Sequence, residues 1–170
     1  MRRLFITVIL FFILPVLALS QNPVAEYLAA PDSLQLDCSF SYTVQGKVPV
    51  TGNGTVWMSG KSFRVRGNGL TVLCDGKSRW TVDEENREVY IESTEDMRDF
   101  LDNPSLLMSE LKNVSYGAGK LKGTYRYDGD DIVLVFSSIM VAPASNKKAF
   151  TPESEVKGYE SVGFTVNDLR

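Results

Sequence analysis

Residues 37–93 carry the clearest structural pattern in the chain, and they read DCSFSYTVQGKVPVTGNGTVWMSGKSFRVRGNGLTVLCDGKSRWTVDEENREVYIES. Apolar and polar residues alternate in short runs, as in Phe63-Arg64-Val65-Arg66 and Trp80-Thr81-Val82-Asp83. Because successive side chains of a β-strand point to opposite faces, each run predicts a strand with one apolar face. Turn residues separate the runs about every 8–9 residues, a spacing typical of antiparallel sandwiches and barrels.

The strongest turn signal in this stretch is Asp75-Gly76. A type I′ hairpin turn needs positive φ at both central positions, which these two residue types tolerate. Further turns are predicted at residues 51–54, 59–61, 67–69 and 84–86. The chain from about residue 35 to about residue 93 is therefore predicted to be a meander of antiparallel strands.

Two stretches outside the meander have the features of helices. Asn22 and Pro23 form a helix start, with the asparagine as N-cap and the proline at the first helical position, and Pro31 ends the segment. A second helical stretch is predicted from residue 94 to about residue 111, restarted by Asn103-Pro104. Its apolar residues recur at helical spacing, so one side is expected to pack against the sheet.

The strand pattern returns in the second half of the chain. Residues 121–127 alternate, and residues 132–136 are continuously apolar, as in a central strand covered on both faces. Residues 142–158 are expected to be a loop, and residues 163–166 a last strand. The sequence thus predicts an α+β, mainly β fold: a mostly antiparallel, strongly curved sheet with helices packed on one side.

The N-terminus has the composition of a secretory signal peptide. Met1-Arg2-Arg3 is followed by an apolar run, residues 4–17, and by Ala18-Leu19-Ser20. That run is shorter than the roughly 20 residues of a membrane span, which favours cleavage after Ser20 over an uncleaved anchor. Residues 21–170 are then expected to form one exported domain. The chain has 18 basic and 21 acidic residues and no long basic run, which argues against nucleic-acid binding.

Cys38 and Cys74 are the only cysteines, and an exported chain would meet an oxidising compartment. A bridge between them would stabilise the fold by roughly 4 kcal/mol on the chain-entropy model. In a simple meander, however, three strand spacings put them about 14 Å apart, and a disulfide needs Cα atoms within about 7 Å. A bridge therefore requires a strongly curled sheet; otherwise both residues act as small buried hydrophobes.

Catalytic signals are missing from the sequence. It contains no histidine, the commonest general base and zinc ligand, and no nucleophile or phosphate-binding motif. Asp128, Asp130 and Asp131 have no glutamate at the twelfth position of a calcium loop, so they are interpreted as a solvated hairpin turn. The prediction is a protein that is not an enzyme and has no catalytic residues, no metal site and no cofactor.

The unusual feature of the sequence is its amount of apolar surface. The concave side of the curved sheet is predicted to carry Phe40, Tyr42, Val44, Val56, Met58, Phe63, Val65, Val72, Trp80 and Val82. The interrupted helix adds Phe100, Leu101, Leu106, Leu107, Met108 and Leu111. Two interpretations stay open: these side chains fill one another as a solid core, or they enclose an apolar cavity under a helical lid. Methionine side chains favour the cavity slightly, because they repack around irregular apolar ligands.

Several of these segments, in this order behind a signal peptide, resemble the LolA family of periplasmic outer-membrane lipoprotein carriers. The similar segments are GNGTVWM (52–58), KSFRV (61–65), CDGKSRW (74–80), Phe150-Thr151-Pro152 and VNDLR (166–170). In that family a glycine-led strand is followed by a strand with an inward phenylalanine and by an Asp-Gly-Lys turn leading to tryptophan. The family tends to have Arg-Pro in the turn after the second strand, where this chain has Ser59-Gly60-Lys61.

The resemblance implies an unclosed antiparallel β-barrel with helices as a lid over a hydrophobic cavity. It implies a monomeric carrier, or chaperone, that binds the acyl chains of triacylated lipoproteins in the periplasm. The partners would be an inner-membrane transporter that releases the lipoproteins and an acceptor at the outer membrane. It implies no catalysis.

Two other functions remain open at this stage. The first is a periplasmic sensor or adaptor of the same fold, which reads a lipid or a partner domain without transporting it. The second is a hydrolase of envelope lipids or glycans, which the missing histidine and nucleophile motif argue against.

Overall fold

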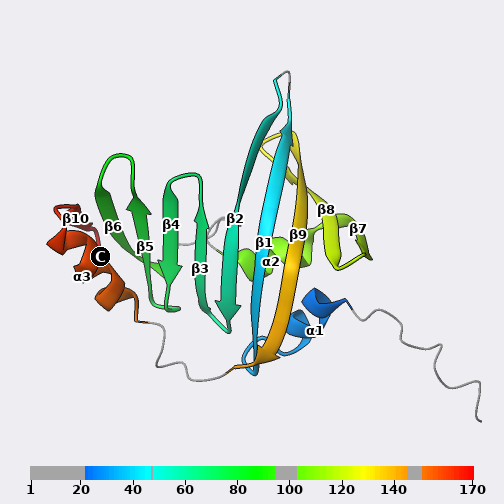
Figure 1. Cartoon of the computed structure of the whole chain (residues 1–170), viewed down its shortest axis with the longest axis horizontal. Helices are drawn as coiled ribbons and strands as arrows, with labels where there is room; N and C mark the ends of the chain where they lie inside the picture. The colour runs from blue at the N-terminus through cyan, green and yellow to red at the C-terminus, as the bar shows by residue number, and fades with distance from the viewer. Residues whose placement is uncertain (1–21, 47, 95–102, 145–150) are drawn as a thin grey trace, which may run out of the picture.

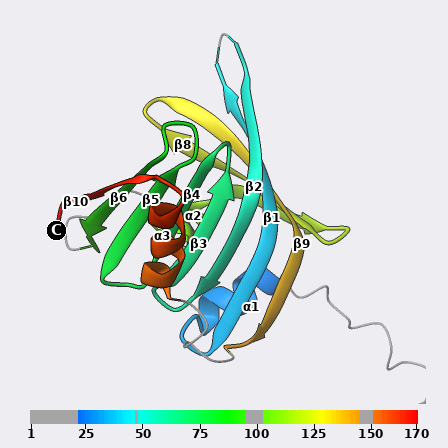
Figure 2. The same ribbon diagram turned by 60° about the vertical axis from the view of Figure 1, so that its left-hand side comes forward.

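The computed structural model describes residues 22–46, 48–94, 103–144 and 151–170. Within these residues the chain forms three helices and one ten-stranded sheet (Figure 1). The sheet bends around its concave side but does not close on itself (Figure 2). The predicted fold, an α+β, mainly β, unclosed barrel-like sheet with helices, is therefore confirmed. The predicted signal peptide, residues 1–20, lies outside the described residues.

The first six strands follow one another in space as they do along the chain, which confirms the predicted meander. The full order is β10-β6-β5-β4-β3-β2-β1-β9-β8-β7, and only β10 runs parallel to its neighbour. The strands are β1 (Leu34–Gln45), β2 (Val50–Ser59), β3 (Ser62–Gly67), β4 (Leu70–Cys74), β5 (Ser78–Asp83), β6 (Glu88–Ser93), β7 (Lys112–Gly117), β8 (Lys120–Tyr127), β9 (Asp130–Pro143) and β10 (Thr165–Asp168).

The first hairpin is longer than the sequence predicts. Residues 51–54 were predicted as a turn, and this is wrong, because Gly52 and Gly54 lie inside β2 opposite Tyr42 and Phe40 of β1. Glycine is more often a turn residue than a strand residue, since it has no side chain to pack. In this sheet the two glycines are needed for a different reason, which concerns the cavity described below.

Each face of the sheet buries its own hydrophobic core. We call the side that carries Phe40 and Tyr42 the inner face and the side that carries Trp80 the outer face. The inner-face core contains Leu36, Cys38, Val56, Met58, Phe63, Cys74, Leu121, Leu134 and Phe136, with Val24 and Tyr27 from α1 (Pro23–Ala29) and Met108 and Leu111 from the region of α2 (Pro104–Glu110). The outer-face core contains Leu73, Trp80, Val82, Val89 and Ile91, with Val156 from α3 (Pro152–Ser161).

The helix starts predicted at Asn22-Pro23 and Asn103-Pro104 are confirmed. The Asn22 side chain accepts a hydrogen bond from the Val24 backbone N–H at 3.1 Å, and the Asn103 side chain accepts one from the Leu106 N–H at 3.1 Å. Each cap satisfies a backbone donor that has no partner within the first helical turn. Residues 95–102 of the predicted second helix lie outside the described residues.

The prediction of a loop at residues 142–158 is wrong, because α3 begins at Pro152. The helix covers the outer-face core with Val156, and Tyr159 packs against that core. Glu155 anchors it to β3 through an ion pair with Arg64, and Arg66 lies 3.8 Å from the same carboxylate. The last strand, predicted at residues 163–166, is present as β10.

Cys38 and Cys74 are both buried free thiols on the inner face. They lie on β1 and β4, which are separated by β2 and β3. Of the two alternatives left open by the sequence, two small buried hydrophobes is therefore the one found. Burial, with a smaller contribution from Asp37, raises the pKa of Cys38 to about 12, and burial also raises the pKa of Cys74.

Candidate apolar binding cavity

The inner face is solid at one end of the sheet and hollow at the other. At the solid end, Val24 and Tyr27 of α1 belong to the same buried cluster as Leu36, Met58 and Phe63. At the other end lies a cavity of about 470 Å³ between the sheet and α2. It is lined by Phe40, Tyr42, Val44, Asn53, Val56, Val65, Gly67, Asn68, Leu70, Val72, Pro104, Leu107, Met108, Tyr125, Tyr127, Ile132, Leu134 and Phe136.

The walls of this cavity are almost entirely hydrocarbon. Phe40 and Phe136, which are register partners on β1 and β9, form adjoining parts of its wall. Among the described residues that line it, none carries a charge, and the polar groups are amides and tyrosine hydroxyls. Its volume falls within the range of about 300–1,000 Å³ typical of small-molecule sites. Such a cavity favours an apolar ligand, because water inside it would find few hydrogen-bond partners.

Gly52 and Gly54 make room for the aromatic side chains of the cavity. A Cβ at Gly52 would lie 2.5 Å from the ring of Tyr42, and a Cβ at Gly54 would lie 2.7 Å from the ring of Phe40. Each glycine is the β2 register partner of the residue whose ring lies over it. Each ring therefore occupies the space that a side chain at its partner position on β2 would need.

Gly54→Ala is expected to lower the free energy of unfolding by about 1–3 kcal/mol, the usual cost of overpacking. The new Cβ would lie 2.0 Å from the backbone carbonyl oxygen of Arg66 as well as against Phe40, so the strand itself would have to move. The measurement is urea unfolding, compared with Gly117→Ala on β7, where a Cβ would meet no atom within 4 Å. Equal stability of the two variants would contradict this packing.

One polar pair lies at the rim of the cavity. The Asn68 side-chain amide donates a hydrogen bond of 2.7 Å to the Tyr42 hydroxyl; Asn68 is exposed and Tyr42 is half-buried. Asn68 has a φ of 52°, a left-handed conformation that asparagine tolerates better than most residues. The β3–β4 turn therefore carries an amide to the mouth of an otherwise apolar cavity.

α2 forms the helical cover of the cavity. Met108, which is 5% exposed, and the partly buried Leu107 both line it. The Ser105 hydroxyl lies 3.5 Å from the sulfur of Met58, which joins the helix to the solid part of the inner core. Leu106 is 39% exposed and is not part of the lining, so the helix directs Leu107 and Met108, but not Leu106, to the cavity.

Some residues predicted for the concave wall line the cavity and others do not. Those that do are Phe40, Tyr42, Val44, Val56, Val65 and Val72. Met58 and Phe63 are on the same face but lie in the solid core beside α1. Both interpretations left open by the sequence thus apply, each at a different end of the same face.

Placing Trp80 and Val82 on the concave face is wrong. Trp80 is the register partner of Leu73, and both are buried in the outer-face core under α3. The loop between Cys74 and Arg79 contains an even number of residues, so Trp80 must share a face with Leu73 rather than with Val72. Both faces of β4 carry apolar residues, so hydrophobicity does not show which face of β4 Trp80 shares. The even number of residues in the turn does show it.

Of the predicted lid residues, some line the cavity and others do not. Leu107 and Met108 line the cavity, while Leu106 is exposed at its outer side. Leu111, 9% exposed, lies against Gly123 of β8, where a Cβ would come within 3.0 Å of its side chain. Phe100 and Leu101 lie outside the described residues.

The far wall of the cavity was not predicted from the sequence. It consists of Tyr125, Tyr127, Ile132, Leu134 and Phe136 on β8 and β9. The alternation of residues 121–127 gave the face of β8, but the pairing of β9 with β1 joins segments about a hundred residues apart. No local pattern reports such a pairing.

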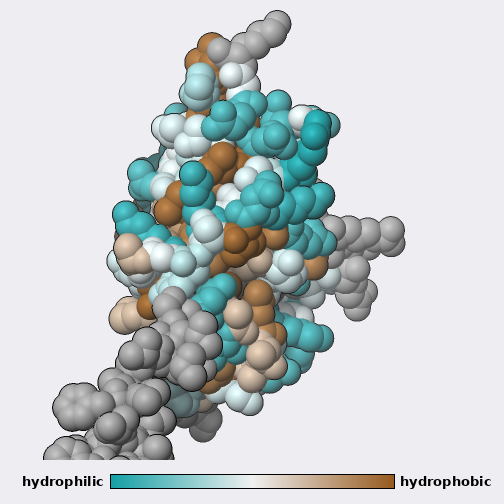
Figure 3. Space-filling view, turned by 90° about the vertical axis from the view of Figure 1, so that its right-hand side faces the viewer, coloured by the Kyte–Doolittle hydropathy of each residue, from teal (hydrophilic) through white to brown (hydrophobic). Residues whose placement is uncertain are grey.

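Apolar surface also reaches the outside of the molecule. Seen from the side of β7 and β8, a band of apolar residues runs through the middle of an otherwise hydrophilic face (Figure 3). Val114 of β7 is 48% exposed. Within the described part of the chain, no helix is long and apolar enough to cross a membrane, and no three His, Cys, Asp or Glu side chains are grouped as metal ligands.

Comparisons with known proteins give little beyond this geometry. No protein-family model and no curated protein matches the chain. Among solved structures, a crystal structure of an uncharacterized conserved protein from Thermus thermophilus is similar, with 13% identity and a TM-score of 0.43 over 88% of this chain and 99% of that chain. The function is therefore argued from the cavity.

Proposed function

We propose that this protein is a periplasmic carrier that binds the acyl chains of lipoproteins in its cavity and shuttles them from the inner to the outer membrane. The observation that supports the proposal is the uncharged cavity of about 470 Å³ between the curved sheet and α2. The sequence resemblance to the lipoprotein-carrier family and the composition of residues 1–20 support the cellular setting.

The energetics of acyl chains explain why a carrier would need this design. Each CH₂ group that leaves water gains about 0.8 kcal/mol, so a long chain does not cross an aqueous space unaided. A carrier that held the chain too well would not release it. In this proposal Leu107 and Met108 of α2, which line the cavity, fill part of the ligand's space in the free state, so opening the cavity costs free energy and lowers the net affinity.

The proposed partners follow from this role. The ligands are triacylated lipoproteins, the donor is an inner-membrane transporter that releases them, and the recipient is an acceptor at the outer membrane. The carrier is proposed to work as a monomer, as the family resemblance implies.

Transfer of a synthetic triacylated lipopeptide tests the proposal directly. The protein is added to donor vesicles that contain the lipopeptide with a fluorescent label and to unlabelled acceptor vesicles. A carrier is expected to speed the appearance of label in the acceptor vesicles in proportion to protein concentration. The same peptide without acyl chains is the control and should not bind.

Two results would count against the proposal. Absence of lipopeptide binding would remove the acyl-chain site. Binding without any acceleration of transfer would instead favour the sensor or adaptor role considered from the sequence.

A further inference from the structure

The mouth of the cavity combines an uncharged rim with acidic surroundings. The polar residues that line the cavity are Tyr42 and Asn68, joined by their 2.7 Å hydrogen bond, together with Asn53, Tyr125 and Tyr127. These groups can donate hydrogen bonds to a ligand, but they supply no positive charge to balance an anion.

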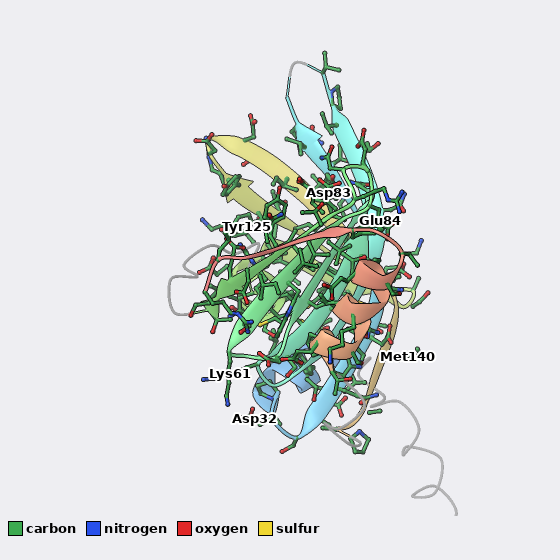
Figure 4. The ribbon with its side chains drawn as sticks, turned by 90° about the vertical axis from the view of Figure 1, so that its left-hand side faces the viewer. Asp32, Lys61, Asp83, Glu84, Tyr125 and Met140 are labelled. Atoms are coloured by element: carbon green, nitrogen blue, oxygen red, sulfur yellow. The ribbon has the colours of Figure 1, made fainter. Side chains whose placement is uncertain are left out.

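Two turns beside the mouth are negatively charged. Leu70, a lining residue, is the register partner of Asp83, and Glu84 and Glu85 follow Asp83 in the β5–β6 turn. Hydrogen bonds from the Asn86 backbone and side chain lower the pKa of Asp83, so this carboxylate is ionised at neutral pH. Figure 4 shows Asp83 and Glu84 toward the same end of the sheet as Tyr125, with Asp32 and Lys61 toward the other end.

The second acidic turn joins β8 to β9. It contains Asp128, Asp130 and Asp131, all exposed, and one cation, because Arg126, the register partner of Asp131, donates a hydrogen bond to the Gly129 carbonyl. Asp130 is the register partner of Tyr127, and Ile132 follows the turn directly; both Tyr127 and Ile132 line the cavity. An anionic head group at the mouth would thus face carboxylates from two sides, while an uncharged one would meet only hydrogen-bonding groups.

We infer that the cavity selects acyl chains attached to an uncharged ester or amide, and rejects the same chains as free carboxylates. Tyr42 and Asn68 are the polar contacts for the carbonyl group, and the two acidic turns exclude the anion. The inference rests on the proposed carrier function and specifies the ligand class of its cavity. It gives a carrier a means of ignoring free fatty acids, which share the hydrocarbon chain of its cargo.

A test of this head-group selectivity requires two ligands that differ only in the head group. Methyl laurate and laurate share one hydrocarbon chain, and at neutral pH only the second is charged. Each is titrated into the full-length protein preloaded with N-phenyl-1-naphthylamine, an uncharged dye that fluoresces in apolar sites. The ester is expected to displace the dye about tenfold more tightly than the carboxylate at low salt, because the anion finds no cation among the described lining residues and is repelled by the acidic turns. Added salt should narrow this difference by screening the acidic turns.

Two variants test the rim itself. Tyr42→Phe removes the hydroxyl but keeps the ring over Gly52, and Asn68→Gly removes the amide at a φ that glycine adopts freely. Each should weaken the ester about threefold to tenfold, the value of one lost hydrogen bond, and weaken the uncharged dye by less. An equal loss of dye binding would mean that the variant damages the cavity, and the rim assignment would be rejected.

The outcomes separate this inference from the carrier proposal. Equal or tighter binding of laurate overturns the head-group selectivity and leaves the carrier proposal standing. Ester preference that neither variant changes overturns the role of Tyr42 and Asn68. Failure of both ligands to displace the dye removes the acyl-chain site, and with it the carrier proposal.

Discussion

Leu107→Glu is expected to weaken acyl-chain binding by at least about 100-fold. Leu107 lies on the cavity side of α2 and is only partly buried, so the variant has room to keep the helix in place. In the bound state its carboxylate would lie against hydrocarbon with no cation among the described lining residues. Burying an unpaired charge costs several kcal/mol, and each 1.4 kcal/mol is a factor of about ten in affinity. The measurement is lipopeptide titration by fluorescence.

Leu106→Glu is the matched control for this variant. It places the same charge on the neighbouring residue of the same helix, but Leu106 is 39% exposed and points away from the cavity. Binding should stay within about twofold of the unmodified protein, as for an ordinary surface substitution. If the two glutamate variants bound equally well, α2 would not be the cover of the ligand site.

Trp80→Ala is expected to lower the free energy of unfolding by about 3–5 kcal/mol. Trp80 is 1% exposed and is among the largest buried side chains of the molecule. It packs with Leu73, Val82 and Val156 between the sheet and α3, so its removal leaves a cavity in the outer-face core. Urea unfolding followed by circular dichroism measures this loss of stability.

The position of Trp80 also predicts what the substitution will not do. Because Trp80 is on the opposite face from the cavity, protein that remains folded should bind an acyl chain with unchanged affinity. Val82→Ala removes less buried surface from the same core and gives a milder variant for the binding measurement. Loss of binding in a fully folded Val82→Ala protein would contradict the face assignment of β5.

The meander could be predicted from the sequence because its signals are local. Runs such as residues 62–67 alternate cleanly, and Asp75-Gly76 marks a hairpin. The Asp75 carboxylate accepts hydrogen bonds from the Lys77 and Ser78 backbone at 2.8 and 2.9 Å, so the turn is stabilised by its own side chain. In such a chain, neighbours along the sequence become neighbours in the sheet.

The assignment of strands to the two faces was harder to predict. β4 carries Val72 on the inner face and Leu73 on the outer face, so its apolar pattern is compatible with either orientation of β5. A slip of one residue in register would exchange the two faces completely. Hydrophobicity alone therefore grouped Trp80 with the cavity residues, although turn parity separates them.

α3 was missed because its apolar side is narrow. The helix reads PESEVKGYES, and it buries only Val156 and the proline at its start. Its position depends on residues far away in the sequence, namely the outer-face core that Val156 joins and Arg64, which pairs with Glu155. A polar segment of this kind resembles a loop until the surface that it covers is known.

The far wall of the cavity could not be predicted from the sequence for a similar reason. β9 is recognisable as a strand, but its place beside β1 closes a loop of most of the chain. The predicted cavity therefore had the wall formed by β1 to β4 and the cover formed by α2, while β8 and β9 were missing from it.

Because both thiols are free, buried and on separate strands, their reactivity can be used to measure transient opening of the sheet. Neither Cys38 nor Cys74 is in a disulfide. A maleimide can reach Cys38 or Cys74 only while the surrounding strands are transiently apart, so the alkylation rate counts those openings. Cys38 lies on the long strand β1 and Cys74 on the shorter strand β4. Comparing their alkylation rates with and without ligand would show which of the two strands opens more often when a ligand binds.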